Sequence, residues 1–299
     1  MLFRSLGWVG IDDAMTPYQA LAHAFSTMPT GGFSTQPRSA EGFSAEAQWI
    51  LALFMLVAGA NFALMFRGLV RRRPHVFARD EEFRLYIVLA LIASAAVTAM
   101  LWGYGIAEGE EAVRTGFFQT VSIMTTTGMS SADFALWLAV LLLALFALMF
   151  VGGSAGSTGG SIKVVRHLLL AKVLRREIDQ TVSPEVVMPI RLNGSPVDER
   201  TVRAIAAFVL LYMGIWAVGA SVIAIDSAIT GAGLGTLDSL AASATTLGNV
   251  GPAFGVAGPM GSFAELGDVS KLTMIGLMWV GRLEIVPVVV LLTRHYWRL

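Results

Sequence analysis

Apolar stretches of membrane-spanning length alternate with short polar connections along the chain. A helix needs ~20 apolar residues to cross a bilayer, and five stretches approach that length: residues 47–70, 83–106, 134–151, 201–225 and 270–292. A further apolar stretch, residues 162–174, follows the third one. The residues between these two, 152–161, are rich in glycine, which disfavours helix interiors. We therefore expect a broken helix at this point.

Three short segments repeat one pattern, each directly before a predicted span. They align without gaps as Ser26-Thr-Met-Pro-Thr-Gly-Gly-Phe33, Ser122-Ile-Met-Thr-Thr-Thr-Gly-Met129 and Thr245-Thr-Leu-Gly-Asn-Val-Gly-Pro252. In this register Gly32, Gly128 and Gly251 coincide, and so do Thr30, Thr126 and Asn249. Each segment follows a stretch that we expect to be a helix too short to span, at residues 17–28, 112–125 and 236–247. The predicted repeating unit is span, short helix, glycine strand and span.

The distribution of charge predicts how the spans are oriented. Most lysines and arginines lie in two connections, residues 67–84 and 163–203, which should face the cytoplasm. The connections that hold the glycine strands then face outside. Residues 1–13 should also lie outside, yet Asp12 and Asp13 interrupt any apolar core for a signal peptide. We therefore expect the sequence to be a fragment that lacks upstream membrane spans.

Composition narrows the class of protein. Apolar residues make up 55% of the 299 residues, charged residues 14%, and the mean hydropathy is +0.68, values typical of a membrane protein. The 21 basic and 21 acidic side chains balance, so charge gives no reason to expect a nucleic-acid partner. With no cysteine and four scattered histidines, the sequence indicates no thiolate or histidine metal site. No nucleophile, base and orienting group converge, so we expect no enzyme.

Glycine strands at membrane depth have a specific chemical use. Non-helical backbone is tolerated there only where protein buries it or where it lines a wet cavity. Carbonyls aimed at a pore axis can replace the water around a cation, and a threonine hydroxyl adds another oxygen. Ordinary loop turns or small-residue helix contacts could explain any one of the segments. Three segments in register, in the same place in each unit, favour a cation pore.

The chain resembles the Trk/Ktr potassium transporter family, in its TrkH-like membrane subunit. The matching features are the run from His23 to Thr35, the run from Phe118 to Asp133, residues 152–163, and Gly281-Arg-Leu-Glu284. The resemblance implies an all-α integral membrane protein with span, pore-helix and span units arranged as a pseudo-fourfold cation pore, here incomplete. It assigns residues 1–74 to a partial second repeat, 75–180 to the third repeat with the broken helix, and 181–299 to the fourth.

The resemblance also implies the function and the ion-filter residues. It implies potassium uptake across the bacterial inner membrane by a multi-pass protein, with K+ as the transported ion and no cofactor. Potassium would bind at Thr30, Gly31, Gly32, Thr126, Thr127, Gly128, Asn249, Val250 and Gly251. Asn249 departs from the threonine found in the other two segments. Two alternatives stay open, a transporter of sodium or mixed monovalent cations on the same scaffold, and a non-conducting fragment.

The glycine-rich run and one arginine are the predicted gate. The resemblance makes residues 152–163 an intramembrane gating loop under the filter. Its glycines are Gly152, Gly153, Gly156, Gly159 and Gly160. A packing kink is the alternative. Arg282 falls within the last predicted span, where an arginine costs roughly 2.5–3.5 kcal/mol on insertion scales and needs an acceptor. We expect it to face the pore and donate hydrogen bonds to carbonyls of this loop; a structural tie between helices is the alternative. We expect such a tie for Asn61.

The resemblance implies partners as well. These are membrane lipid, a TrkA-like cytosolic nucleotide-binding regulatory subunit, and a second copy of the full-length subunit in a homodimer; no nucleic acid is expected. Residues 172–176 and 181–200 are the predicted docking surface for the regulatory subunit.

Overall fold

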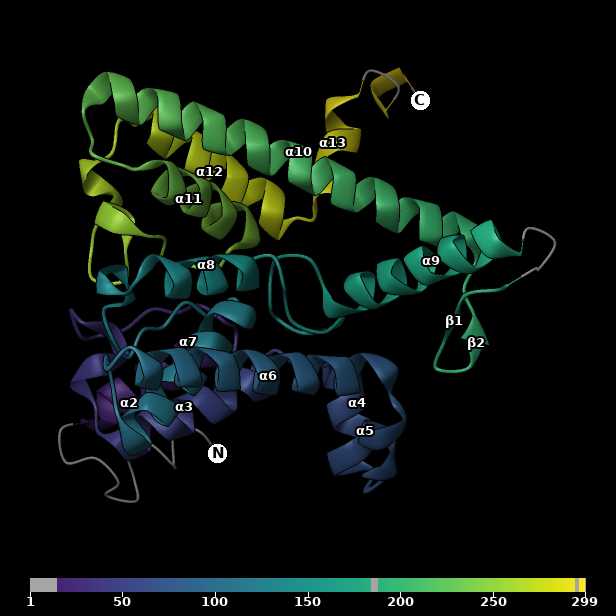
Figure 1. Ribbon diagram of the computed structural model, residues 1–299, viewed down its shortest axis with the longest axis horizontal. Coiled ribbons are helices and arrows are strands. Elements are labelled where there is room, and N and C mark those ends of the chain that lie inside the picture. Colours follow the sequence, from purple (N-terminus) through teal and green to yellow (C-terminus); the bar gives the residue numbers. More distant parts are fainter. Residues whose placement is uncertain (1–14, 184–187, 294–295, 299) are drawn as a thin grey trace.

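The computed structural model describes residues 15–183, 188–293 and 296–298, and the fold is helical apart from one small hairpin (Figure 1). The longer helices are α2 (Pro17–Thr27), α3 (Ala45–Ala58), α6 (Glu81–Gly103), α7 (Gly109–Met124), α8 (Ala139–Leu148), α9 (Val164–Val182), α10 (Glu199–Thr230), α11 (Thr236–Gly248), α12 (Asp268–Arg282) and α13 (Ile285–Leu292). The shorter elements are η1 (Ser39–Gly42), α4 (Phe62–Met65), η2 (Phe66–Val70), α5 (His75–Arg79), η3 (Phe134–Leu136), β1 (Arg191–Leu192), β2 (Ser195–Pro196), η4 (Gly255–Ala257), η5 (Phe263–Glu265) and η6 (Tyr296–Arg298).

The three predicted short helices are present as α2, α7 and α11, and their ends lie within three residues of the predicted ones. Local chemistry sets the start of α2, because the Thr16 side chain accepts the Gln19 backbone N–H and the Gln19 side chain accepts that of Thr16. Neighbouring helices enclose the other two: α7 packs against α6 and α8 of its own unit and against α3 of the preceding one, and α11 packs against α10 and α12. These contacts reproduce the predicted unit of span, short helix and span.

Two of the predicted spans are continuous helices, α6 and α10. Asp80 and Asp198 accept backbone N–H groups at their first turns, and Gly231 ends α10 with a φ of 70°. Both helices are long and apolar enough to cross a bilayer. Figure 1 shows α10 and α12 on one side of the molecule and α3 and α6 on the other, with α8 between them. The largest apolar core is formed mainly by side chains of α8, α10, α11 and α12.

Two other spans were wrongly predicted as continuous helices. Residues 47–70 form α3 and then, after a bend of 100°, α4 and η2. Residues 270–292 form α12 and α13, bent by 109° at Leu283 and Glu284, where Glu284 has a φ of 58°. Each bend turns the chain sharply without interrupting its apolar composition, so counting apolar residues gave the length of the stretch and missed the change of direction.

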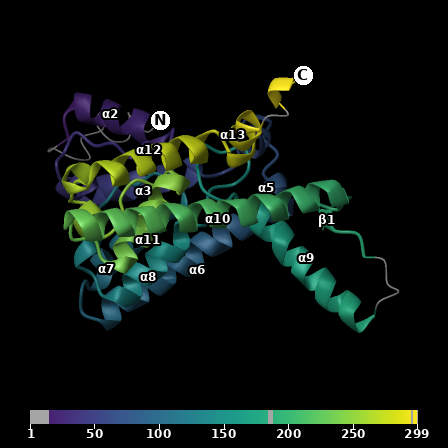
Figure 2. The ribbon, with the colours of Figure 1, turned by 90° about the horizontal axis from the view of Figure 1, so that it is seen from above.

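The predicted break after the third span is present. Helix α8 ends at Leu148 and α9 begins at Val164, with a parallel bridge between Val151 and Ile162 closing the base of the intervening loop. We call residues 152–163 the central loop. Helix α9 then diverges from the rest of the bundle (Figures 1 and 2). It runs to Val182, beyond the predicted end of the apolar stretch at residue 174.

The two basic connections meet at one end of the molecule. In the β1–β2 hairpin Asn193 accepts the Glu81 backbone N–H at 2.8 Å and donates to Asp80 at 2.9 Å, and Lys172 of α9 forms an ion pair with Glu81. This common end agrees with the predicted shared sidedness. The repeat boundaries at 74/75 and 180/181 stay predictions, and residues 1–13 and 184–187 lie outside the described residues.

Candidate functional site: three glycine turns over a central loop

Residues 30–32, 126–128 and 249–251, here called the three turns, have the same backbone conformation. Their first residues, Thr30, Thr126 and Asn249, are left-handed with φ of 55°, 57° and 53°. Non-glycine residues rarely adopt this conformation, which costs roughly 1–2 kcal/mol. A glycine with positive φ then ends each turn, with φ of 72°, 81° and 129° at Gly32, Gly128 and Gly251.

Each of the three turns also closes the end of its short helix in the same way. The second residue donates its backbone N–H to the carbonyl five positions earlier, in the pairs Gly31 to Ser26, Thr127 to Ser122 and Val250 to Thr245, at 2.7, 2.9 and 2.9 Å. The first residue donates to the carbonyl three positions earlier in every case. The ungapped register read from the sequence is therefore also the register of the backbone.

The three turns lie against one another. A Cβ atom on Gly32 would lie 2.0 Å from the Thr127 carbonyl oxygen, and one on Gly128 would lie 2.1 Å from that of Val250. Only glycine permits backbones to approach so closely. A cavity of about 340 Å³ opens over all three turns, and none of the described residues that line it is charged. Backbone and neutral side chains form this surface.

The central loop contacts all three turns. Thr30 donates its hydroxyl to the Thr158 carbonyl at 3.1 Å, and the Gly160 N–H donates to the Thr126 hydroxyl at 2.6 Å. A Cβ on Gly160 would lie 2.2 Å from the carbonyl of Gly248, the residue before the third turn. The threonines that begin the first two turns therefore hold the central loop with their hydroxyl groups.

The five glycines predicted for the gate all lie in the central loop, and four of them meet other backbone closely. A Cβ on Gly152 would lie 2.3 Å from the Gly160 carbonyl, one on Gly153 2.8 Å from the Gly59 carbonyl, and one on Gly159 3.0 Å from the Thr125 carbonyl. Gly156 differs, because its surroundings leave room for a Cβ although its φ is 72°. The loop is thus packed tightly enough to require glycine at most of these positions.

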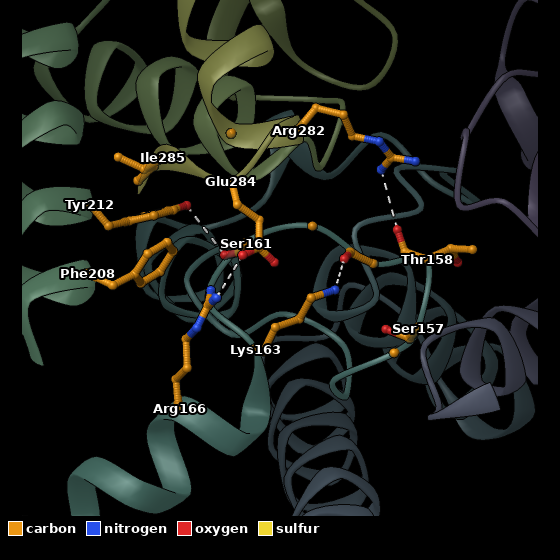
Figure 3. Close-up of a pocket in the computed structure, with 14 residues that line it drawn as sticks. Ser157, Thr158, Ser161, Lys163, Arg166, Phe208, Tyr212, Arg282, Glu284 and Ile285 are labelled. Atoms are coloured by element: carbon orange, nitrogen blue, oxygen red, sulfur yellow. Dashed lines mark hydrogen bonds and ion pairs between the residues drawn. The ribbon is translucent and has the colours of Figure 1, made fainter. Parts of the chain in front are cut away.

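Arg282 contacts the central loop, as expected from the sequence. Its Nη1 donates to the Thr158 carbonyl at 3.3 Å, the same oxygen that accepts from Thr30 (Figure 3). Arg282 is the last residue of α12, where the helix dipole favours a cation, so its predicted position in the middle of a continuous span was wrong. Whether it faces an ion pathway stays a prediction.

A cavity of about 390 Å³ lies beside Arg282 and the central loop, and it shares no lining residue with the cavity over the three turns. Lys163 donates to the Gly159 carbonyl, next to the Thr158 carbonyl that Arg282 binds. Arg166 forms an ion pair with Glu284 at 3.1 Å (Figure 3). Lys163 and Arg282 therefore bind the carbonyls of two successive loop residues, Gly159 and Thr158.

The sequence reasoning missed the backbone that supports the loop. The Ser154 N–H donates to the Gly59 carbonyl at 2.8 Å, and the Phe62 N–H donates to that of Gly156 at 3.2 Å. The bend between α3 and α4 exposes these groups to the loop. Asn61 accepts the Leu64 N–H at 3.0 Å and caps α4, so the expectation of a tie between helices was wrong. Asparagine two residues after a glycine in an apolar stretch was the available signal.

The predicted docking surface for a regulatory subunit is largely engaged within the chain. Lys172 and Arg176 form ion pairs with Glu81 and Glu199. Arg175 is exposed, and its Nε lies 3.9 Å from Asp179 Oδ2, at the outer limit of an ion pair. Residues 184–187 of the predicted surface lie outside the described residues.

Comparison with known proteins identifies the family. The TrkH family model, described as a cation transport protein, matches residues 5–297. The chain belongs to the TrkH family. It is 36% identical over 95% of its length to the Trk system potassium uptake protein TrkH of Salmonella typhimurium, and 35% identical to the protein of that name from Escherichia coli. It covers 58% of each relative.

A solved structure agrees with this assignment. The crystal structure of the potassium transporter TrkH from Vibrio parahaemolyticus superimposes with a TM-score of 0.86 at 34% identity, over 95% of this chain and 60% of that one. The predicted fold class, an all-α membrane protein built from repeated span, pore-helix and span units, is confirmed. The chain thus spans somewhat more than half the length of the TrkH proteins that it resembles.

Proposed function

We propose that this chain forms part of a potassium uptake protein of the bacterial inner membrane, and that the three turns line its ion filter. The shared backbone conformation of the three turns carries the proposal: three segments far apart in the sequence adopt the same strained turn and meet in one place. Relatives named potassium uptake proteins support the choice of ion.

The chemistry of the three turns suits a dehydrated monovalent cation. Left-handed and glycine residues let successive carbonyls turn toward a common axis, where their oxygens replace the hydration shell of the ion. The cavity over the three turns has no charged side chain among its described lining residues, so an ion would be bound by carbonyl dipoles. Weak binding by dipoles allows the ion to leave as well as to enter.

The central loop and Arg282 are proposed as the gate. The hydroxyl groups of Thr30 and Thr126 and the guanidinium of Arg282 bind the loop, and Lys163 at its end donates to the Gly159 carbonyl within it. The loop lines one cavity and contacts the turns that line the other, so an ion leaving the filter would meet it next. Displacement of the loop would open this path.

Sodium or mixed monovalent cations are the alternative substrate. Only the last position of the turns, that of Gly32, Gly128 and Gly251, is glycine in all three. The third turn also has Asn249 where the other two have threonine, so the three turns differ in sequence. A filter with few fixed carbonyls separates potassium from sodium less strictly. Competition between the two ions distinguishes these possibilities.

Growth of a bacterium that lacks potassium uptake tests the proposal. The 299-residue chain and its gene extended upstream are expressed separately, each beside a Gly128→Ala version. We expect growth at limiting potassium that depends on Gly128 and resists a tenfold excess of sodium. Growth blocked by sodium would favour the alternative substrate, and failure of both versions despite normal membrane insertion would count against the proposal.

We also propose that a cytosolic nucleotide-binding subunit docks at the end formed by α9 and the β1–β2 hairpin, and that full-length subunits form homodimers. The exposed Arg175 and the divergence of α9 from the bundle support this docking site (Figure 2). Loss of co-purification of the regulatory subunit on Arg175→Glu would support it, and unchanged co-purification would argue against it.

A further inference from the structure

Glu82 is a buried carboxylate beside the central loop. Its residue is 7% exposed, although it lies in the first turn of α6, next to a charged and solvated end of the molecule. Burying an ionised carboxylate is costly unless hydrogen bonds compensate it. The contacts of Glu82 therefore indicate what its burial accomplishes.

A backbone N–H group of the central loop compensates the Glu82 carboxylate. The Ala155 N–H donates to Oε1 at 2.5 Å. Ala155 lies in the first half of the central loop, whereas Glu82 lies in the first turn of α6. Glu82 thus joins two elements that are distant in sequence, α6 and the central loop.

The neighbouring carboxylate has a different set of partners. Glu81 forms an ion pair with Lys172, in the middle of α9, and accepts the Asn193 backbone N–H of the β1–β2 hairpin at 3.2 Å. Adjacent glutamates therefore contact different parts of the molecule, and Glu82 contacts the loop. This makes Glu81 a matched control for any change at Glu82.

We propose that Glu82 is a positioning residue whose negative charge fixes the central loop to the first turn of α6. Without this charge, the Ala155 N–H loses its charged acceptor, and the loop can move relative to α6. The consequence for ion flux rests on the proposed function, but the position of the loop does not. A measurement of the loop itself therefore separates the two.

The chain contains no cysteine, so a single introduced cysteine can report on the loop. Ser157→Cys places a thiol in the loop beside the cavity next to Arg282, and Ser243→Cys places one at a fully buried position of α11. Each is combined with Glu82→Gln, Glu82→Ala or Glu81→Gln. The rate of reaction with a polar maleimide is measured on the protein in lipid nanodiscs, where both faces are accessible.

We expect Glu82→Gln and Glu82→Ala to raise the labelling rate of Ser157→Cys at least about fivefold, as for the loss of one charge-assisted hydrogen bond. Glu81→Gln should leave the rate unchanged, and Ser243→Cys should stay protected in every background. Equal rates in the Glu82 variants and wild type would overturn the proposal, and so would labelling of Ser243→Cys, which would mean general unfolding. Faster loop labelling without any change in rubidium uptake would uphold the role of Glu82 and contradict the gate.

Discussion

Replacing Arg282 with alanine removes a guanidinium that donates a hydrogen bond to the central loop. The bond removed is the one from Nη1 to the Thr158 carbonyl, at 3.3 Å. Hydrogen bonds to charged groups contribute about 1.5–3 kcal/mol. The side chain is exposed and the bond is long, so the lower value applies. A loss of ~1.4 kcal/mol changes an equilibrium about tenfold.

The expected result is faster ion uptake. The Thr30 hydroxyl still donates to the Thr158 carbonyl at 3.1 Å, so the loop is loosened without being freed. We predict that the initial rate of rubidium uptake rises between about threefold and tenfold in Arg282→Ala. Arg282→Lys should lie between this variant and wild type, because an ammonium keeps the charge and loses the planar fork.

A matched control is available in α10. Arg203 is exposed and belongs to no hydrogen bond or ion pair found among the described residues, so Arg203→Ala should take up rubidium at the wild-type rate. Uptake is compared at equal amounts of protein in the membrane. A rate in Arg282→Ala equal to wild type, or below it, would refute the reasoning that this arginine restrains the loop.

Three further changes test the packing around the central loop. Gly160→Ala places a Cβ 2.2 Å from the Gly248 carbonyl, and overpacking of this kind costs about 1–3 kcal/mol. The melting temperature of this variant in detergent should therefore fall by several degrees. Gly103→Ala, whose added Cβ meets open space, should melt like wild type. Asn249→Ala keeps a β-carbon at a φ of 53° and loses the side-chain amide that donates to the Met278 carbonyl at 3.2 Å, whereas Asn249→Gly loses the same donor but relieves the backbone strain. We expect the melting temperature of Asn249→Gly to lie between those of wild type and Asn249→Ala. A lower melting temperature for Asn249→Gly than for Asn249→Ala would contradict the strain at this turn. Glu284→Gln breaks an ion pair whose carboxylate side is 57% exposed, so thermal stability should change by no more than ~1 kcal/mol; a larger loss would mean that the pair with Arg166 holds the bend before α13.

The sequence was sufficient for the features that depend on local chemistry. The register of the three turns could be read because threonine or asparagine and then glycine recur at fixed spacing after each short helix. Residues 152–161 were identified as a break for the same reason, since five glycines in ten positions exclude a helix. These signals act within a few residues, and the backbone follows them.

Direction and long-range contacts could not be read in the same way. The bends near Gly59 and Glu284 leave an apolar stretch apolar, so hydropathy carries no sign of them, and only the cap at Asn61 was a local clue. Glu82 and Lys163 looked like ordinary charges at the end of a span. Their partners, Ala155 and Gly159, became known only once the chain was folded around the loop.

The most direct test of the shared ion pathway is rubidium uptake by three variants, one in each turn. Gly32→Ala, Gly128→Ala and Gly251→Ala each force a β-carbon into a left-handed position, and in the first two it would also lie about 2 Å from the neighbouring turn. Gly214→Ala in α10, which meets open space, is the control. If the three turns line one filter, each variant should lose at least about nine-tenths of uptake, whereas uptake like that of Gly214→Ala in any one of them would contradict it.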